Sequence, residues 1–210
     1  MNVEYATDEE RVEELKDWWK ENGKSVIFGL ILGLSILFGW RWWGNYQLGQ
    51  SLQASTLYTQ LVMAIKENKT EQAQAISDEL FKKYSSRPYS VYAALALAKI
   101  KVEANDFASA KMHLQWASEH ASTPELERLA SLRLARVLSV LGEYDKAYAI
   151  VNSADSGNYI SMYEELKGDI LAKQGKPDKA LLSYRIAIRA LPAGSSGVPG
   201  LQFKIDDLAK

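Results

Sequence analysis

Histidine and carboxylate side chains are the residues of this sequence that could serve catalysis or metal binding. Its two histidines, His113 and His120, are seven positions apart, and neither has a carboxylate at a spacing typical of metal ligands. We interpret both as exposed histidines on a helix. The adjacent carboxylates at positions 164–165 and 206–207 are typical of a solvated helix face. The sequence has no cysteine and no GxSxG or HExxH motif, so we predict a protein that is not an enzyme and holds no cofactor or metal.

A glycine-rich stretch, GSSGVPG at residues 194–200, is a further motif whose chemistry needs to be considered. A phosphate-binding loop requires a preceding strand and a following Lys-Ser or Lys-Thr pair, and this stretch has neither. We therefore expect a flexible turn and no small-molecule substrate. Residues 201–210 are then expected to form a short closing helix, with Leu201, Ile205 and Leu208 on the side that covers the preceding helices.

Charge is nearly balanced along the chain. The sequence has 25 lysines and arginines against 26 aspartates and glutamates. From Arg41 onward there are 21 basic and 18 acidic residues, a net charge of +3 without a basic stripe. Nucleic-acid binding requires basic side chains concentrated on one face, so we expect no nucleic acid among the partners.

The elements that position these residues begin with an apolar stretch at residues 25–43, SVIFGLILGLSILFGWRWW. Its first sixteen residues carry no charge. As a helix the stretch would span roughly 28 Å, close to the ~30 Å hydrocarbon thickness of a bilayer. Apolar residues cover every side of such a helix, which favours a transmembrane segment over a buried core helix. The acidic leader and the bulky residues that follow the stretch are not typical of a cleaved signal peptide.

Tryptophans flank this stretch on both sides. Five of the six in the chain do so, Trp18 and Trp19 before it and Trp40, Trp42 and Trp43 at its far end. Indole rings collect at membrane interfaces because they are apolar apart from an N–H that needs a wet partner. We predict that these residues, together with the snorkelling side chain of Arg41, lie at the membrane interface.

The distribution of basic residues predicts the orientation of the anchor. Four lysines and arginines precede the stretch, whereas after Arg41 the next basic residue is Lys66. Because the side richer in Lys and Arg stays in the cytoplasm, residues 1–24 are expected there and residues 44–210 on the far side. The prediction is a single-pass type II membrane protein whose larger, C-terminal domain lies beyond the membrane.

The N-terminal tail is expected to form a short amphipathic helix from about Asp8 to Asn22. Thr7 and Glu10 have the spacing of a capping box at its start. Apolar residues recur on one face (Val12, Leu15, Trp18 and Trp19). Three interpretations stay open: a helix on the membrane surface, a solvated juxtamembrane helix, and a docking site for a cytoplasmic protein, which the acidic charge favours over anionic lipid.

The remainder of the chain shows an internal repeat and almost no strand pattern. Small, large and turn residues fall at the offsets of a tetratricopeptide repeat at Gly168, Leu171, Gly175, Ala180, Tyr184, Ala187 and Pro192. The same frame recurs 33 residues upstream at Leu134, Ala135, Leu138, Gly142, Tyr144, Ala147 and Ala154, and a further 37 upstream at Leu97, Ala98, Asn105, Phe107, Ala110, Leu114 and Ala117. A degenerate first copy contains Leu57, Leu61, Ala64 and Ala73. The predicted fold is all-α, a transmembrane helix followed by a tetratricopeptide-repeat-like α-solenoid over residues 44–210.

Stacked helix pairs line a groove with the first helix of each pair. In this frame the predicted groove residues are Tyr92, Leu95, Lys99, Leu129, Leu132, Arg136, Met162, Glu165 and Asp169. Apolar side chains mixed with charges of both signs suit an extended or partly folded peptide. For the three leucines, packing between repeats is an equally good interpretation.

The order of these features resembles the YfgM family. The resemblance covers essentially the whole chain and is carried by DEERVEELKDWWKENGK at residues 8–24, GWRWW at 39–43, LRLARV at 132–137, and Lys204, Ile205 and Leu208. It implies a single-pass inner-membrane protein facing the periplasm, an ancillary subunit of the SecYEG translocon, and a partner of the membrane-anchored chaperone PpiD that assists secreted clients. The resemblance also implies a link to an envelope stress-response regulator.

Two function hypotheses follow, and a third is disfavoured. The first is a periplasmic adaptor or co-chaperone anchored beside the translocon, with unfolded secreted chains as possible clients. The second is a regulatory membrane protein whose cytoplasmic tail captures a signalling protein. A membrane-bound enzyme would require a cofactor or metal site that the sequence does not offer.

Overall fold

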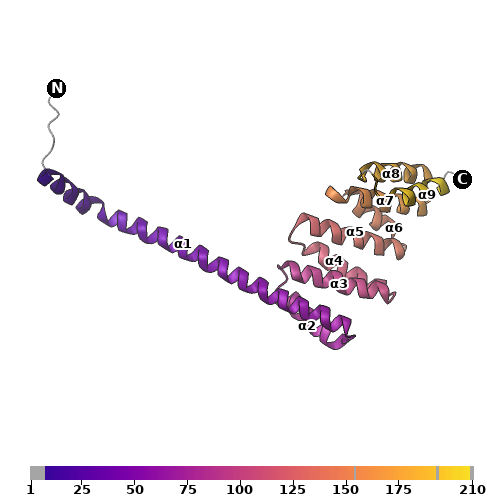
Figure 1. The fold of residues 1–210 in the computed structure, drawn as a ribbon, viewed down its shortest axis with the longest axis horizontal. Coiled ribbons are helices and arrows are strands. Elements are labelled where there is room, and N and C mark those ends of the chain that lie inside the picture. The colour runs from indigo at the N-terminus through magenta and orange to yellow at the C-terminus, as the bar shows by residue number, and fades with distance from the viewer. Residues whose placement is uncertain (1–7, 154, 193, 209–210) are drawn as a thin grey trace, which may run out of the picture. The chain divides into compact units, whose positions relative to one another are not determined.

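The computed structural model describes residues 8–153, 155–192 and 194–208, and every element in these ranges is helical (Figure 1). The all-α prediction is confirmed. Thr7 of the predicted capping box and Ala154 of the repeat frame lie outside the described residues. The helices are α1 (Asp8–Lys66), α2 (Thr70–Lys83), α3 (Pro88–Glu103), α4 (Phe107–Glu119), α5 (Pro124–Val140), α6 (Tyr144–Ser153), the 3₁₀ turn η1 (Gly157–Tyr159), α7 (Ile160–Lys173), α8 (Pro177–Ala190) and α9 (Val198–Leu208).

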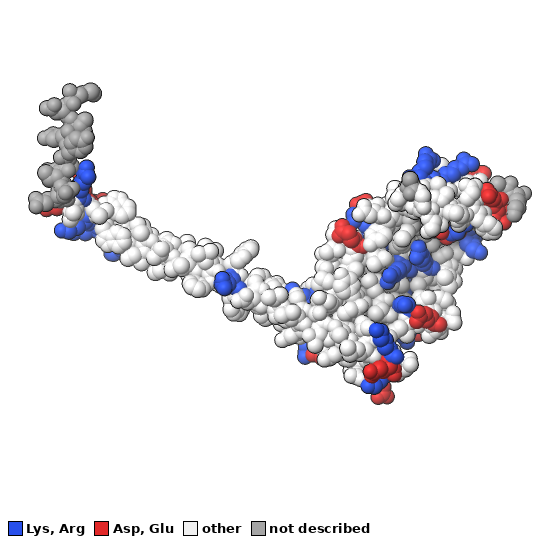
Figure 2. All heavy atoms as spheres, in the orientation of Figure 1, with Lys and Arg blue, Asp and Glu red and all other residues white. Residues whose placement is uncertain are grey.

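The chain divides into two compact units, Met1–Gln50 and Ser51–Lys210, and helix α1 runs through the boundary between them. In the first unit α1 carries the predicted membrane-spanning stretch. Its best 18-residue window has a mean hydropathy of 1.7, and only 6 % of that window is buried. Figure 2 shows how few charged side chains this part of the surface bears. By length and composition α1 is the one helix among the described residues that is suited to cross a membrane.

The predicted end of the tail helix near Asn22 is wrong, because α1 continues through this region without a break. Gly23 is helical, and the Trp19 ring covers it so closely that a Cβ there would lie 3.2 Å from the indole. A glycine inside a helix costs only about 1 kcal/mol relative to alanine, too little to end a helix of this length. The predicted ends of the transmembrane segment, near residues 24 and 43, therefore lie inside one continuous helix. That the membrane begins and ends there stays a prediction.

The second unit is built from helix pairs joined by the same turn. Each turn has one residue with positive φ: Asn68 (56°), Asn105 (58°), Gly142 (77°) and Gly175 (71°). After each of them, the next backbone N–H donates to a carbonyl five residues back, as from Lys176 to Leu171 at 2.9 Å. This is a Schellman motif, which ends a helix and reverses the chain. Because this motif also occurs at Asn68, the last part of α1 and the whole of α2 form a first helix pair. This is the degenerate first copy that the sequence predicted.

Small residues lie where the two helices of a pair cross. The predicted repeat positions Ala98, Ala110, Ala135, Ala147 and Ala180 are all buried. The paired helices α3–α4, α5–α6 and α7–α8 lie side by side in sequence order (Figure 1). Larger apolar side chains fill the space around each crossing and form three core clusters along the unit. The tetratricopeptide-repeat-like prediction is therefore confirmed in its helix order, its turns and its small positions.

The closing helix is confirmed, but it begins earlier than predicted. Helix α9 starts at Val198, so residues 198–200 belong to its first turn and not to a flexible turn. Pro199 is compatible with this position because the first turn of a helix needs no internal N–H partner. Leu201 is buried against the core cluster that contains Leu171, and Ile205 and Leu208 pack on the same cluster.

Among the described glycines, Gly168 has the tightest surroundings, and these can be tested by adding one methyl group. A Cβ at Gly168 would lie 2.6 Å from Cδ1 of Tyr184, a ring that is 3 % exposed and held by a hydrogen bond from its hydroxyl to Asp169. Overpacking of this kind costs about 1–3 kcal/mol, against a gain of about 1 kcal/mol in helix propensity. We expect Gly168→Ala to lower the free energy of unfolding by about 1–2 kcal/mol.

The measurement is chemical unfolding in detergent micelles, followed by far-ultraviolet circular dichroism. Gly200→Ala is the matched control, because nothing lies within 4 Å of a Cβ built there. The double variant G168A/Y184L should lose less stability than the sum of its single variants, since removing the ring makes room for the methyl group. A Gly168→Ala protein as stable as the parent would contradict the close packing.

Candidate partner-binding groove

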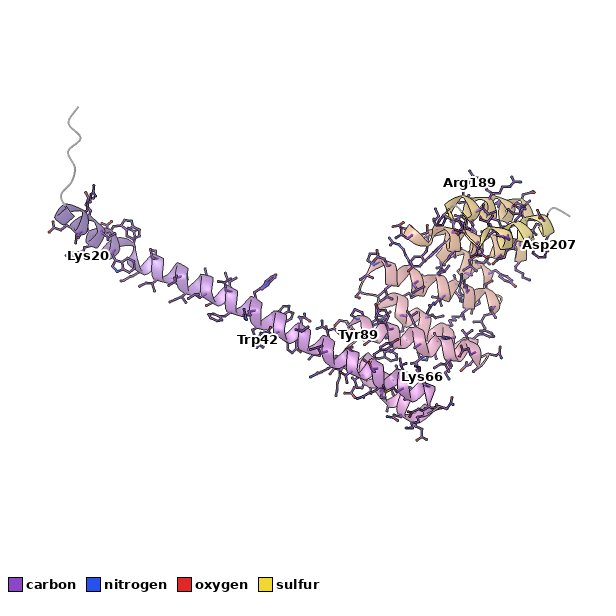
Figure 3. All side chains as sticks on the ribbon, in the orientation of Figure 1. Lys20, Trp42, Lys66, Tyr89, Arg189 and Asp207 are labelled. Atoms are coloured by element: carbon purple, nitrogen blue, oxygen red, sulfur yellow. The ribbon has the colours of Figure 1, made fainter. Side chains whose placement is uncertain are left out.

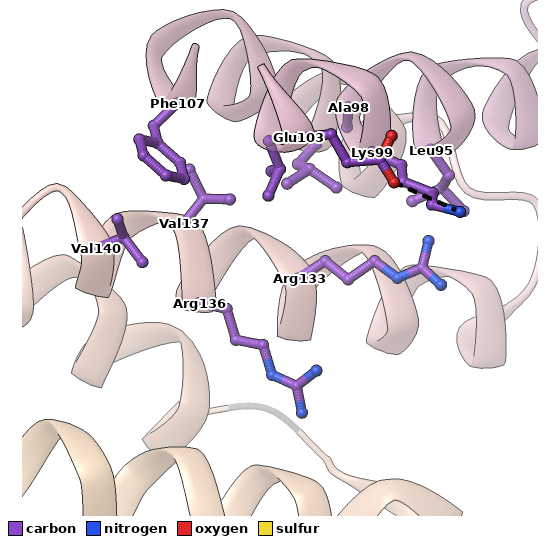
Figure 4. A pocket seen from close by; sticks show the side chains of 11 residues that line it. Leu95, Ala98, Lys99, Glu103, Phe107, Arg133, Arg136, Val137 and Val140 are labelled. Atoms are coloured by element: carbon purple, nitrogen blue, oxygen red, sulfur yellow. Dashed lines mark ion pairs between the residues drawn. The ribbon is translucent and has the colours of Figure 1, made fainter. Parts of the chain in front are cut away.

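A hollow of about 380 Å³ lies between helices α3, α4 and α5 of the second unit (Figure 4). Its floor is apolar because α3 and α5 face each other with buried side chains, among them Leu95 and Val137. Phe107, at the start of α4, closes one end. The side chain of Asp106 caps that helix by accepting from the backbone N–H of Ser109 at 3.1 Å. The full lining is Leu95, Ala98, Lys99, Val102, Glu103, Phe107, Leu114, Arg133, Arg136, Val137 and Val140.

The rim of the hollow is partly apolar and predominantly basic. Val140 is 62 % exposed at the end of α5 and adds apolar surface to the rim. Lys99 and Glu103 form an exposed ion pair at 3.7 Å on α3. Arg133 and Arg136 extend from α5 in different directions (Figure 4) and make no ion pair or hydrogen bond with any residue that the structure describes. Three basic side chains and one acidic side chain therefore line the hollow.

Three of the predicted groove residues, Leu95, Lys99 and Arg136, are brought together in this hollow. Leu132 is only 1 % exposed and belongs to the first core cluster, so it packs between repeats and does not line a groove. Leu129 is partly buried and packs against the same cluster. The exposed Tyr92 lies outside the hollow, in a cluster with Tyr58 and Tyr89 whose ring centroids are each 6.1 Å apart.

The third part of the predicted groove is occupied by the chain itself. Met162 is 48 % exposed on α7, but Glu165 and Asp169 are both bonded to Lys204 of α9. The Lys204 ammonium donates to Glu165 Oε1 at 2.7 Å and to Asp169 Oδ1 at 2.7 Å. Burial lowers the pKa of Lys204, but the hydrogen bonds and charges of the two carboxylates outweigh it and leave that pKa raised. Helix α9 thus neutralises the acidic side chains that the sequence placed in an open groove.

The residues that sequence reasoning missed are Arg133 and the apolar rim residues Val102 and Val140. A signal for them exists, because Arg133, Arg136 and Val140 follow Leu129 at intervals of four, three and four residues. That spacing is typical of one face of a helix. The frame used in the prediction started from Leu129 and moved to Leu132, which lies about 100° away from Arg133 around the helix.

The histidines differ from the prediction in one respect. His120 is exposed and stacks on Trp116, with ring centroids 4.1 Å apart. His113 is partly buried beside Phe81 of α2, and burial lowers its pKa. The prediction that His113 is exposed is therefore wrong. Within the described ranges, no three His, Asp or Glu side chains are grouped so that they could hold a metal ion.

Comparison with known proteins identifies the family. A family model described as a tetratricopeptide repeat-like domain matches residues 16–210. A Haemophilus influenzae protein named ancillary SecYEG translocon subunit is 35 % identical to this chain, and the match covers 87 % of this chain and 90 % of the relative. The relatives of that name in Escherichia coli (98 % of each chain) and Neisseria gonorrhoeae (97 % of this chain, 98 % of the relative) are each 30 % identical. The chain belongs to the YfgM family.

The predicted interface residues of this YfgM-family protein all lie on α1. Trp18, Trp19, Trp40, Trp42 and Trp43 are exposed on the helix, as is Arg41. The rings of Trp18 and Trp19 are 6.5 Å apart, and Trp42 stacks on Tyr46 with centroids 6.0 Å apart and an interplanar angle of 17°. Figure 3 shows Trp42 extending from α1. Exposed indoles at both ends of an apolar helix are the arrangement that a membrane interface favours, and their placement there remains a prediction.

The contact of Lys204 with α7 gives a test of how this YfgM-family protein closes its groove. In Lys204→Met the two carboxylates lose their cation, and partly exposed charged hydrogen bonds of this kind contribute about 1 kcal/mol. We expect amide hydrogens of α9 to exchange about fivefold to tenfold faster at pH 7, measured by mass spectrometry. The raised pKa keeps Lys204 charged there, so its contribution is lost only as the pH rises through that pKa.

Lys179→Met serves as the control, since Lys179 is exposed on α8. Unchanged exchange of α9 in Lys204→Met would show that the apolar contacts of Leu201 alone hold this helix in place.

Proposed function

We propose that this protein is a membrane-anchored periplasmic adaptor or co-chaperone. It associates with the SecYEG translocon and with a PpiD-like membrane-anchored chaperone, and it assists the trafficking of secreted proteins. The observation that carries the proposal is the open hollow between α3 and α5, which has an apolar floor and two arginines without an ion-pair partner among the described residues. Relatives that match nearly the whole chain are named as ancillary subunits of this translocon, which supports the partner.

The membrane anchor supports the same proposal, because it would concentrate the repeat unit beside its partners in the membrane. The apolar segment of α1 suits an inner-membrane protein, and the four basic residues before it favour a cytoplasmic N-terminus. The repeat unit would then lie on the periplasmic side, where exported chains emerge. Tethering two binding sites to one membrane raises their effective concentration, up to about the millimolar range for short linkers. Weak contacts at the hollow therefore suffice for an adaptor.

Site-specific photo-crosslinking tests the adaptor in intact membranes. A benzoylphenylalanine at Val140, which is exposed at the rim of the hollow, should crosslink to a translocon subunit, a membrane-anchored chaperone or an exported chain. The same probe at Leu182, an exposed apolar residue of α8, is the matched control and should give at least fivefold less product. Adducts are identified by mass spectrometry. Absence of all three kinds of adduct at Val140 would refute the proposed role of the hollow.

A second candidate function rests on the N-terminal part of α1. Val12, Leu15, Trp18 and Trp19 are all exposed there. Leu15, Trp18 and Trp19 also line an apolar depression on the helix surface. This surface fits a regulatory protein whose cytoplasmic tail binds a signalling partner, such as a regulator of the envelope stress response.

Deletion of residues 2–20 separates the two functions. If the protein is an adaptor, export of secreted proteins should proceed at the parental rate, measured by pulse-chase labelling, because the anchor and the repeat unit remain. If it is regulatory, the deletion should reproduce the stress-response phenotype of the full gene deletion. Membrane insertion of the shortened protein is verified in parallel by carbonate extraction, and its orientation by protease digestion of spheroplasts, because the deletion removes Arg11, Lys16 and Lys20.

A further inference from the structure

The charges on the face formed by the first helices are divided between an open part and a closed part. In the closed part, Glu165 and Asp169 of α7 are neutralised by Lys204 of α9. In the open part, Arg133 and Arg136 of α5 have no acidic partner among the described residues. Glu103, the acidic residue in the lining of the hollow, is already paired with Lys99. What the face offers is an apolar hollow with an excess of positive charge.

From this division we infer the chemistry of the segment that the hollow binds. It is an extended segment of a partner protein with an apolar side chain flanked by aspartates or glutamates. The inference deepens the proposed function and rests on it, because it assumes that the occupant is a protein. Charge complementarity indicates that the residues flanking the apolar side chain are acidic, because aspartate or glutamate would pair with the two arginines, which have no acidic partner among the described residues.

The size of the hollow limits what enters it. About 380 Å³ is near the lower end of the range of roughly 300–1,000 Å³ that small-ligand sites occupy. A few side chains fit such a volume, but a folded domain does not. The lining at Leu95, Val102 and Val140 provides the apolar contacts for one or two of them.

The arginines set the spacing of the acidic residues. Arg133 extends toward the Lys99–Glu103 pair, whereas the guanidinium of Arg136 points away from α3 (Figure 4). Two carboxylates, one on either side of the apolar anchor, fit this arrangement better than one. A planar guanidinium pairs with a carboxylate through two parallel hydrogen bonds, which gives orientation as well as affinity. In an extended segment alternate side chains point to opposite sides, so acidic residues two positions before and after the anchor would face the same surface as the anchor.

Peptide binding to the full-length protein in lipid nanodiscs tests this inference by fluorescence anisotropy. The probe is a fluorescein-labelled decapeptide with a central phenylalanine and a glutamate two positions to each side. One comparison peptide carries lysine in place of the glutamates, and another carries serine in place of the phenylalanine. We expect the probe to bind at least tenfold more tightly than either comparison peptide, and its affinity to fall as salt rises.

Two protein variants show where the probe binds. R133Q/R136Q should weaken probe binding about tenfold, since each exposed charged hydrogen bond contributes modestly. R185Q/R189Q is the matched control, because Arg185 and Arg189 are exposed arginines on α8, away from the hollow. In the reverse direction Val140→Asp should weaken binding of the glutamate probe and strengthen binding of the lysine peptide, a reversal that loss of folding cannot produce.

The outcomes separate this inference from the proposed function. Equal binding of all three peptides, or equal loss in both double variants, overturns the inference. Equal binding of the serine peptide and the probe also overturns it, because attraction is then electrostatic without an apolar anchor. If the Val140 crosslinks to translocon, chaperone or client form while the probe fails to bind, the adaptor stands and the segment chemistry is wrong. If neither is seen, the adaptor itself is wrong.

Discussion

Close approach of paired helices is the constraint on which the repeat unit depends. Ala98, Ala110, Ala135, Ala147 and Ala180 contribute little apolar area themselves, but each lets two backbones come near enough for the larger side chains around them to interlock. Gly168 is the extreme case, since the buried Tyr184 ring occupies the place of a side chain. With larger residues at these positions, the leucines that now fill the cores would be held apart and would lose contacts on both sides.

The same constraint gives rise to the hollow. Helices α5 and α7 contact each other directly, whereas between α3 and α5 a space with an apolar floor remains. At the other end of the unit, α9 lies across α7 and bonds its acidic residues through Lys204. The surface that remains open is thus selected by an element outside the repeat frame. Its charge follows from which residues are already paired within the chain.

Much of this architecture was predictable because its determinants are local. Gly142 and Gly175 mark left-handed turns by residue type, and Asn105 does so because asparagine tolerates the same conformation. Leu132 was placed in the groove because successive residues of α5 are only 100° apart around the helix. Apolar residues occur on both its buried face and its exposed face, so residue type alone does not separate the two. The continuity of α1 was missed because a glycine such as Gly23 commonly ends a helix. In the structure Gly23 is helical and lies under the Trp19 ring, a contact that the sequence does not reveal. Pairings such as Lys204 with Asp169, and the cover of His113 by Phe81, join residues more than 30 positions apart and are not encoded in local spacing.

Helix α9 has a consequence for assembly. A stack of like units ends in the kind of surface that it uses internally, so an uncovered end invites the first pair of another copy and leads to open-ended filaments. Here Leu201 fills that end, while Gln202 and Asp206 turn outward and bond to each other at 2.8 Å. An eleven-residue helix thereby covers the apolar end of the stack, so that the last pair does not expose the surface through which the inner pairs contact their neighbours.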